Sequence, residues 1–176
     1  DGILSVADKI SREAKKDALV SIESTIPKGT SKKVFEILNH RLHVVHAPHR
    51  WYASEEKEHG VNQLRVIGGV CDCCLRVGLQ FYGSYNDGRG RGNYPTTSSS
   101  YKDLRIAMHP VSQIETAEIT KIAENAHRYL QIAFAEELYL YCQANDINFS
   151  ELRDAVNTKW NVDILEPRDG IGEPFL

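Results

Sequence analysis

The sequence of 176 residues has no excess of basic side chains, because 24 acidic residues slightly outnumber 21 basic ones. This balance argues against a protein dedicated to binding a polyanion such as DNA or RNA. The chain also has no apolar run near the ~20 residues that cross a bilayer, and its first residues form no signal-peptide core. With 41% hydrophobic and 26% charged residues, it is expected to be globular, cytoplasmic and of a size that suits one domain.

Cysteine is scarce, with four residues in the chain: Cys71, Cys73, Cys74 and Cys142. Without a secretory signal, we interpret them as reduced thiols. The C-D-C-C cluster could suggest zinc, but it lacks the paired C-x-x-C arrangement of zinc sites. We therefore expect no metal here, and a metal-binding module is the least favoured interpretation of the chain.

Histidine recurs every third residue in one segment, at His40, His43, His46 and His49. The segment includes a predicted strand, and side chains alternate between the two faces of a strand. Three-residue steps then fall on opposite faces, so we do not expect one site made by all four rings.

Short apolar segments alternate with amphipathic ones along the first two thirds of the chain. The predicted helices are 3–16, 31–39 and 72–82, and the predicted strands are 18–23, 42–46 and 104–108. The turn 24–30 contains Pro27 and Gly29, which end regular structure, and the Gly- and Ser-rich residues 83–100 are predicted to be a loop or disordered insert. This alternation is typical of an α/β fold with a parallel sheet and crossover helices.

Residues 112–145 form the strongest local pattern, a predicted helix without Gly or Pro that would be ~45 Å long. Ser112 and Glu115 have the spacing of a capping box, and Asn145 can end the helix in the left-handed conformation. Apolar residues cover much of its circumference, so we expect a partner subunit to cover it, forming a homodimer. A shorter helix follows, with Ser150 as the expected N-cap.

Two sets of polar residues are candidates for a functional site. Lys121 and Asn125 lie one helical turn apart, where they could hold a water or a developing oxyanion or simply form a solvated polar stripe. The turn 24–30 follows a predicted strand, at the edge where open α/β sheets bind ligands. Its hydroxyls and amides would suit a phosphate or polar ring, unless Thr30 merely caps the next helix.

Five segments carry a resemblance to a known family. They are S-T-I-P-K-G-T at 24–30, A-P-H-R at 47–50, R-V-I-G-G at 65–69, the segment 116–138 of the long helix and 157–172 near the end. In this order they resemble the UDP-glucose/GDP-mannose dehydrogenase family of nucleotide-sugar 6-dehydrogenases. The P-x-R and R-V-I-G-G forms are closer to the branch that makes N-acetylmannosaminuronate.

The resemblance implies an architecture and a reaction. Residues 1–111 would be the C-terminal half of a Rossmann-like NAD-binding domain, and 112–176 an all-α central domain that dimerises. The family oxidises the C6 alcohol of a UDP-sugar to a carboxylate for polysaccharide synthesis, using two NAD molecules and a cysteine thiolate that traps the aldehyde.

The resemblance also implies roles for individual residues: Ser24, Thr25 and Pro27 at the cofactor, Arg50, Lys121 and Asn125 at the substrate, and Lys121, Asn125 and Thr25 in catalysis. Lys121 and Asn125 would stabilise the oxyanion or position a water, beside which Thr25 would lie. Glu118 and Arg128 would support the helix or the dimer contact.

Several family features are missing from the 176 residues. There is no G-x-G-x-x-G fingerprint, His49 replaces the glutamate of P-E-R, and Gly170-Ile171-Gly172 is not followed by the catalytic cysteine. The UDP-binding domain is also missing. We therefore expect a fragment of such an enzyme, inactive by itself, or alternatively a non-catalytic dimeric scaffold or interaction module derived from its core.

Overall fold

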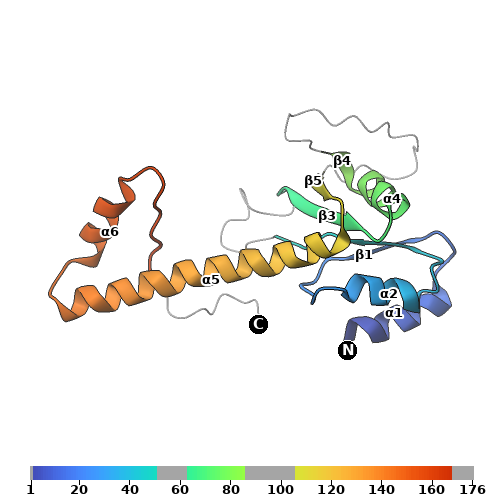
Figure 1. Cartoon of the computed structure of the whole chain (residues 1–176), viewed down its shortest axis with the longest axis horizontal. Coiled ribbons are helices and arrows are strands. Elements are labelled where there is room, and N and C mark those ends of the chain that lie inside the picture. Colours follow the sequence, from blue (N-terminus) through green and yellow to red (C-terminus); the bar gives the residue numbers. More distant parts are fainter. Residues whose placement is uncertain (1, 51–62, 86–105, 168–176) are drawn as a thin grey trace. The chain divides into compact units, whose positions relative to one another are not determined.

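The structure is a computed structural model that describes residues 2–50, 63–85 and 106–167 (Figure 1). The chain divides into two compact units, Asp1–Ile122 and Ala123–Leu176, so that the boundary lies inside the long helix. Among the described helices, none combines the length and the apolar character that a membrane crossing requires.

The first unit is built on a five-stranded sheet with the order β1-β2-β3-β5-β4. Its strands are β1 (Leu19–Ile22), β2 (His43–His46), β3 (Arg65–Gly69), β4 (Gly83–Tyr85) and β5 (Ile106–Val111). Neighbouring strands are parallel, as predicted, except β2 and β3, which are antiparallel. In this antiparallel pair, Gly68 and Gly69 at the end of β3 lie opposite His46 and Val45 at the end of β2.

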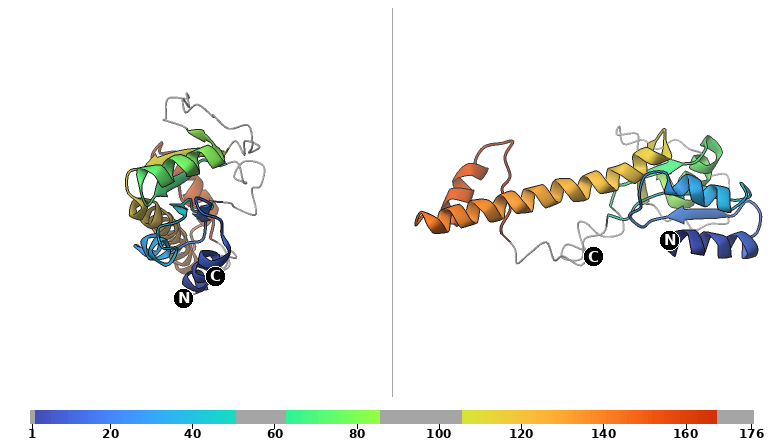
Figure 2. Two further views of the ribbon diagram at one scale, coloured as in Figure 1. Left: turned by 90° about the vertical axis from the view of Figure 1, so that its right-hand side faces the viewer. Right: turned by 60° about the horizontal axis from the view of Figure 1, so that its bottom comes forward.

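Helices cover both faces of this sheet (Figures 1 and 2). On one face, α4 (Asp72–Tyr82) packs on Val45 and Ile67, which are fully buried. On the other, α1 (Gly2–Glu13) and α2 (Thr30–Ile37) enclose Val44. Adjacent valines of β2 therefore serve opposite cores, as strand geometry requires.

The segment after α4 corrects one prediction. Residues 83–85, assigned to the predicted loop 83–100, form strand β4 and pair in parallel with β5, with Gly83 opposite Ile106. The sequence does not indicate this strand, because glycine and serine have low β propensity. The strand forms by pairing with β5, which is distant in the sequence. The rest of the predicted loop lies outside the described residues.

Helix α5 (Ile114–Ala144) has 31 residues, which corresponds to about 46 Å. Its ends differ from the prediction. The helix begins after Ser112, and Glu115 forms an ion pair with Lys32 instead of a capping box. At the other end Asp146, not Asn145, adopts the left-handed conformation with φ 54°. This lets the amide of the next residue donate to the Cys142 carbonyl at 3.0 Å, as in a Schellman motif.

The second unit has a small core of its own. Helix α6 (Phe149–Asn157) packs against α5, and the buried residues are Ala135, Cys142, Phe149 and Ile164. Asn148 is the N-cap of α6, because its side chain accepts a hydrogen bond from the Glu151 amide at 3.3 Å. The predicted cap, Ser150, is instead inside the helix. The Gly170-Ile171-Gly172 segment lies outside the described residues.

The first turn of α5 packs closely against β3 at Gly68. A Cβ atom at Gly68 would lie 2.8 Å from the Cα of Ile114 and 3.2 Å from the Cβ of Ala117. No side chain fits at this position, so glycine in R-V-I-G-G allows α5 to pack directly on the sheet backbone.

Candidate functional site

The turn after β1 lies at the carboxyl edge of the sheet. Ile26 is buried and anchors the turn, whereas Ser24, Thr25 and Pro27 are exposed. Gly29 ends the turn with φ 84° and is the N-cap of α2. Thr30 therefore does not cap the helix, which leaves the exposed hydroxyls at the strand end as a candidate binding surface.

Glu118 holds this turn against helix α5. Its carboxylate oxygens accept hydrogen bonds from the amides of Gly29, at 2.6 Å, and Ser31, at 2.8 Å. The side chain is fully buried, and a carboxylate at a helix N-terminus is favoured by the free amides and the helix dipole. Glu118, which the resemblance assigns to supporting the helix or a dimer contact, also holds the turn before α2.

His46 lies in the same buried region. Burial lowers the pKa of its imidazole from the usual 6.5, and the negative charge of Glu118 opposes this shift. The ring is completely buried at the end of β2. His46 is therefore neutral at pH 7. Its ring belongs to the buried interior and not to the exposed carboxyl edge of the sheet.

A hydrogen-bonded network lies at the same edge. The Glu23 carboxylate accepts a hydrogen bond from the Tyr82 hydroxyl at 2.6 Å and pairs with the buried Arg65 guanidinium at 3.2 Å. Ser21 Oγ lies 2.7 Å from the Tyr82 hydroxyl. Burial, together with the bond to Glu23, raises the pKa of Tyr82. Sequence reasoning missed this network, because its members are far apart in the sequence and become neighbours only when α4 packs on the sheet.

Lys121 and His49 share an electrostatic environment at this edge. Burial and then the Arg65 charge lower the pKa of His49, Glu23 opposes them, and the Lys121 charge adds a smaller lowering effect. The His49 amide also donates to the Glu23 carbonyl at 3.1 Å. Lys121 follows Glu118 by one turn of α5. The cationic groups at this edge are suited to bind an anionic ligand or a developing negative charge.

The other predicted site residues take different positions. Arg50 lies just beyond β2 and donates from Nη1 to the Leu64 carbonyl at 2.9 Å. Asn125 follows Lys121 by one turn of α5, is exposed, and belongs to the second unit. The structure thus connects the turn 24–30 to the Lys121 segment through Glu118.

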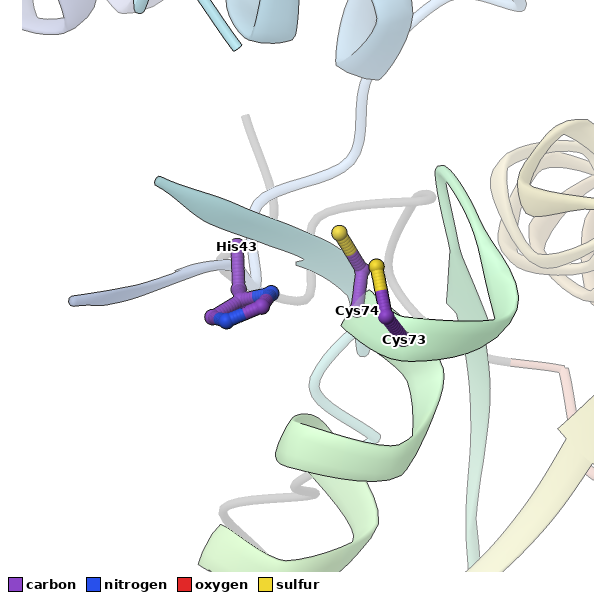
Figure 3. A group of neighbouring side chains, drawn as sticks. All are labelled: His43, Cys73 and Cys74. Atoms are coloured by element: carbon purple, nitrogen blue, oxygen red, sulfur yellow. The ribbon is translucent and has the colours of Figure 1, made fainter. Parts of the chain in front are cut away.

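The four regularly spaced histidines have four different surroundings. His40 stacks on Phe35 with ring centroids 4.5 Å apart, while His46 and His49 take the positions given above. His43 is different: its imidazole lies near the thiols of Cys73 and Cys74, and one potential ligand atom from each of the three residues lies within 4.8 Å of the other two (Figure 3).

The C-D-C-C segment begins helix α4. The sulfur atoms of Cys71 and Cys74 are hydrogen-bonded at 3.1 Å, and the Cys74 amide donates to the sulfur of Cys71 at 3.3 Å. Burial raises the pKa of Cys71, but hydrogen bonds from Cys73 and Cys74 outweigh it and lower the pKa overall. Burial raises the pKa of Cys74 to about 12. Sequence analysis overlooked one signal, since Cys71 and Cys74 themselves have the C-x-x-C spacing.

Cys142, the remaining thiol, is 1% exposed and packs in the core of the second unit. A substrate cannot reach it, so it does not replace the family's catalytic cysteine.

Comparison with known structures defines the class of protein. The chain resembles the UDP-D-ManNAc dehydrogenase of Pyrococcus horikoshii with a TM-score of 0.75 and 25% identity, covering 97% of this chain and 38% of that one. It resembles the native UDP-N-acetyl-mannosamine dehydrogenase of Staphylococcus aureus with a TM-score of 0.72 and 26% identity, covering 96% and 38%. The sheet therefore has the Rossmann-type fold of these dehydrogenases.

The sequence comparisons identify the family. Residues 115–176 match the central domain of the UDP-glucose/GDP-mannose dehydrogenase family. The UDP-N-acetyl-D-mannosamine dehydrogenase of Methanococcus maripaludis is 30% identical over 170 residues, covering 97% of this chain and 35% of the relative. The Escherichia coli enzyme of that name is 29% identical over 183 residues, covering 96% and 39%. The chain belongs to this family and spans between about a third and two fifths of these relatives.

Proposed function

We propose that the chain is the part of an NAD-dependent nucleotide-sugar 6-dehydrogenase that contains the second half of the NAD-binding domain and the central domain. One observation carries the proposal. Glu118, on the helix that also bears Lys121, accepts the amides of Gly29 and Ser31. This contact fixes the turn 24–30 beside the helix at the carboxyl edge of β1 and β2, where ligands of open α/β sheets bind.

The nicotinamide cofactor that the dehydrogenase family implies fits this edge. Ser24 and Thr25 present exposed hydroxyls directly after β1, and Pro27 adds an exposed apolar surface. These residues would bind the nicotinamide end, and NAD, when bound, accepts the electrons removed from C6 of the sugar. The proposed role of Thr25 is to hold a water beside that ring.

Lys121 and Asn125 are proposed to act on the substrate oxygen. A protonated lysine and an amide one helical turn apart can donate hydrogen bonds to the same oxygen, which stabilises negative charge as it develops. Arg50 is proposed to bind the anionic substrate. The charge of Lys121 lowers the pKa of His49. The same charge would therefore stabilise a negatively charged oxygen at this edge of the sheet.

The proposed substrate is a UDP-linked N-acetylhexosamine, and its product is a uronic acid for polysaccharide synthesis. The names of the related proteins support this choice, since UDP-N-acetyl-D-mannosamine dehydrogenases match nearly the whole chain. The A-P-H-R and R-V-I-G-G segments point to the same branch of the family.

The proposed partner is a second copy of the chain, bound through helix 112–145. Large apolar side chains on α5 are exposed in the single chain, including Leu130 at 65%, Phe134 at 59% and Tyr141 at 57%. Positions 130, 134 and 141 fall on one side of a helix with 3.6 residues per turn. An apolar stripe of this kind is typical of a subunit contact.

The proposed function is tested by replacing the homologous segment of the Escherichia coli UDP-N-acetyl-D-mannosamine dehydrogenase with residues 1–167, so that the Escherichia coli enzyme supplies the catalytic cysteine that does not follow Gly172 here. We expect the purified chimera to form NADH from UDP-N-acetylmannosamine, and the 176-residue chain alone to form none. Circular dichroism and light scattering establish that the chimera is folded. A folded chimera without activity would contradict the proposal.

A further inference from the structure

The reversal between β2 and β3 brings together groups that are far apart in the sequence. Gly69, at the end of β3, pairs with Val45 of β2, and the Val70 amide donates to the Val44 carbonyl at 3.2 Å. The chain then continues directly into the C-D-C-C segment. As a result the first turn of α4 lies beside His43, at the start of β2, on the edge of the sheet opposite the turn 24–30.

This arrangement is tightly packed at its backbone. A Cβ atom at Gly69 would lie 2.4 Å from the Leu75 amide nitrogen and 2.8 Å from the Cys71 carbonyl oxygen. The tight turn places the thiols of Cys73 and Cys74 against the imidazole of His43, with ligand atoms within 4.8 Å of one another (Figure 3). Cys71 lies against the same group, 3.1 Å from Cys74 between sulfur atoms.

We propose that His43, Cys73 and Cys74 bind a zinc ion, with Cys71 as the fourth ligand. Thiolates and one imidazole form the Cys3His set of structural zinc sites, with Zn–S distances of about 2.3 Å and tetrahedral geometry. In such geometry, ligand atoms lie about 3.8 Å apart, so the ligand atoms of His43, Cys73 and Cys74, which lie within 4.8 Å of one another, need to approach only slightly. The sulfur atoms of Cys71 and Cys74, which are 3.1 Å apart, must separate slightly to bind the same ion. Each thiol that binds releases its proton to solvent, and no electron is transferred.

The ion would join β2 to the start of α4 within the first unit. His43 comes from a strand, and the cysteines come from a helix that covers the same face of the sheet. A crosslink between these elements stabilises the folded unit by the free energy of metal binding. The site lies away from the Thr25 edge, so it is independent of the proposed dehydrogenase function.

A redox-active disulfide between Cys71 and Cys74 is the competing use of the same thiols, because C-x-x-C pairs at helix N-termini are often reactive. Zinc is favoured because His43 and Cys73 have no part in such a disulfide, although the structure places both against Cys74.

The direct test is metal binding by the reduced 176-residue chain. We expect one Zn²⁺ per chain by competition with a chromophoric chelator, and we expect Co²⁺ to give thiolate charge-transfer and tetrahedral absorption bands. Zn²⁺ should also protect the exposed thiol of Cys73 from alkylation, as measured by mass spectrometry.

Matched variants distinguish a built site from unspecific binding. Cys73→Ser and His43→Ala should each weaken Zn²⁺ binding by about 100-fold or more, since even second-shell changes cost about 10- to 100-fold. The controls are Cys142→Ala and His109→Ala, which lie outside the group and should bind as the unsubstituted chain does. Cys73 is exposed, so its replacement leaves the fold intact by circular dichroism.

Two outcomes would overturn the proposal. One is equal Zn²⁺ affinity in Cys73→Ser, His43→Ala and the unsubstituted chain. The other is a reduced chain that retains no zinc but forms a Cys71–Cys74 disulfide on air oxidation, seen as a mass loss of two hydrogens.

Discussion

Glu118 links the fold of the first unit to its candidate site. The carboxylate is fully buried and accepts two backbone amides at the start of α2. Hydrogen bonds to a charged acceptor are stronger than neutral ones, and an amide left without a partner in a buried position is costly. The residue is therefore a positioning residue for the turn 24–30.

Replacing Glu118 by glutamine should destabilise the chain by about 1–3 kcal/mol, because an amide nitrogen then faces a buried amide donor. Urea unfolding at neutral pH measures the change. The matched control is Glu115→Gln on the same helix, which removes only the partly exposed ion pair with Lys32 and should cost about 0–1 kcal/mol. Equal losses in the two variants would show that Glu118 does not hold the turn.

The sequence indicates single residues well where their role depends on local spacing. Thr25 follows a strand and Lys121 lies on a helix, and both positions can be predicted from periodicity and from the resemblance. The Glu118 contacts cannot be predicted in this way, because Gly29 and Glu118 are 89 residues apart. The His43–Cys74 group depends equally on an antiparallel strand pair that local pattern does not indicate.

At the scale of elements, the sequence predicts that the helices and the strands β1, β2 and β5 exist better than it predicts where they end, and it does not predict β3 or β4 as strands. Helix α4 has the predicted bounds, and α5 is one long helix as expected. The residue in the left-handed conformation after α5 is Asp146 rather than Asn145, and the N-cap of α6 is Asn148 rather than Ser150. Several neighbouring polar residues can serve as caps, and tertiary packing decides which one is used.

The contact between α5 and β3 gives an element-scale prediction. Gly68→Ala should cost about 1–3 kcal/mol, because the added methyl group would meet the Ile114 backbone and overpack a closed contact. Thermal unfolding followed by circular dichroism measures the effect. Gly2→Ala is the control, since nothing lies within 4 Å of the added atom, and its effect should stay within about 0.5 kcal/mol. A Gly68→Ala chain as stable as the control would contradict this account of the packing.

At the scale of the whole molecule, the chain consists of two units, each with its own core. The first carries the Rossmann-type sheet and its candidate site, and the second carries the helical part that matches the family's central domain. A length that suits one domain is therefore divided between two compact units, a distinction that composition alone does not make.

The proposed dimer is tested with two substitutions on the exposed stripe of α5. Leu130→Glu and Phe134→Glu together place charges in an interface that would otherwise exclude water, so the chain should become monomeric. Light scattering at micromolar concentration measures the mass, and the unsubstituted chain should be a dimer. Lys159→Glu changes the charge at an exposed site outside α5 and should remain dimeric. An unsubstituted chain that is monomeric would refute the dimer.

The central claim is that Lys121 acts on the substrate at the carboxyl edge of the sheet, and the rate of NADH formation by the chimeric enzyme tests it most directly. Lys121→Ala should lower kcat by about 100-fold or more, as expected when a group that stabilises an oxyanion is lost, while the exposed Lys33→Ala keeps the rate of the unsubstituted chimera. A folded Lys121→Ala chimera that forms NADH as fast as the Lys33→Ala control would contradict the account.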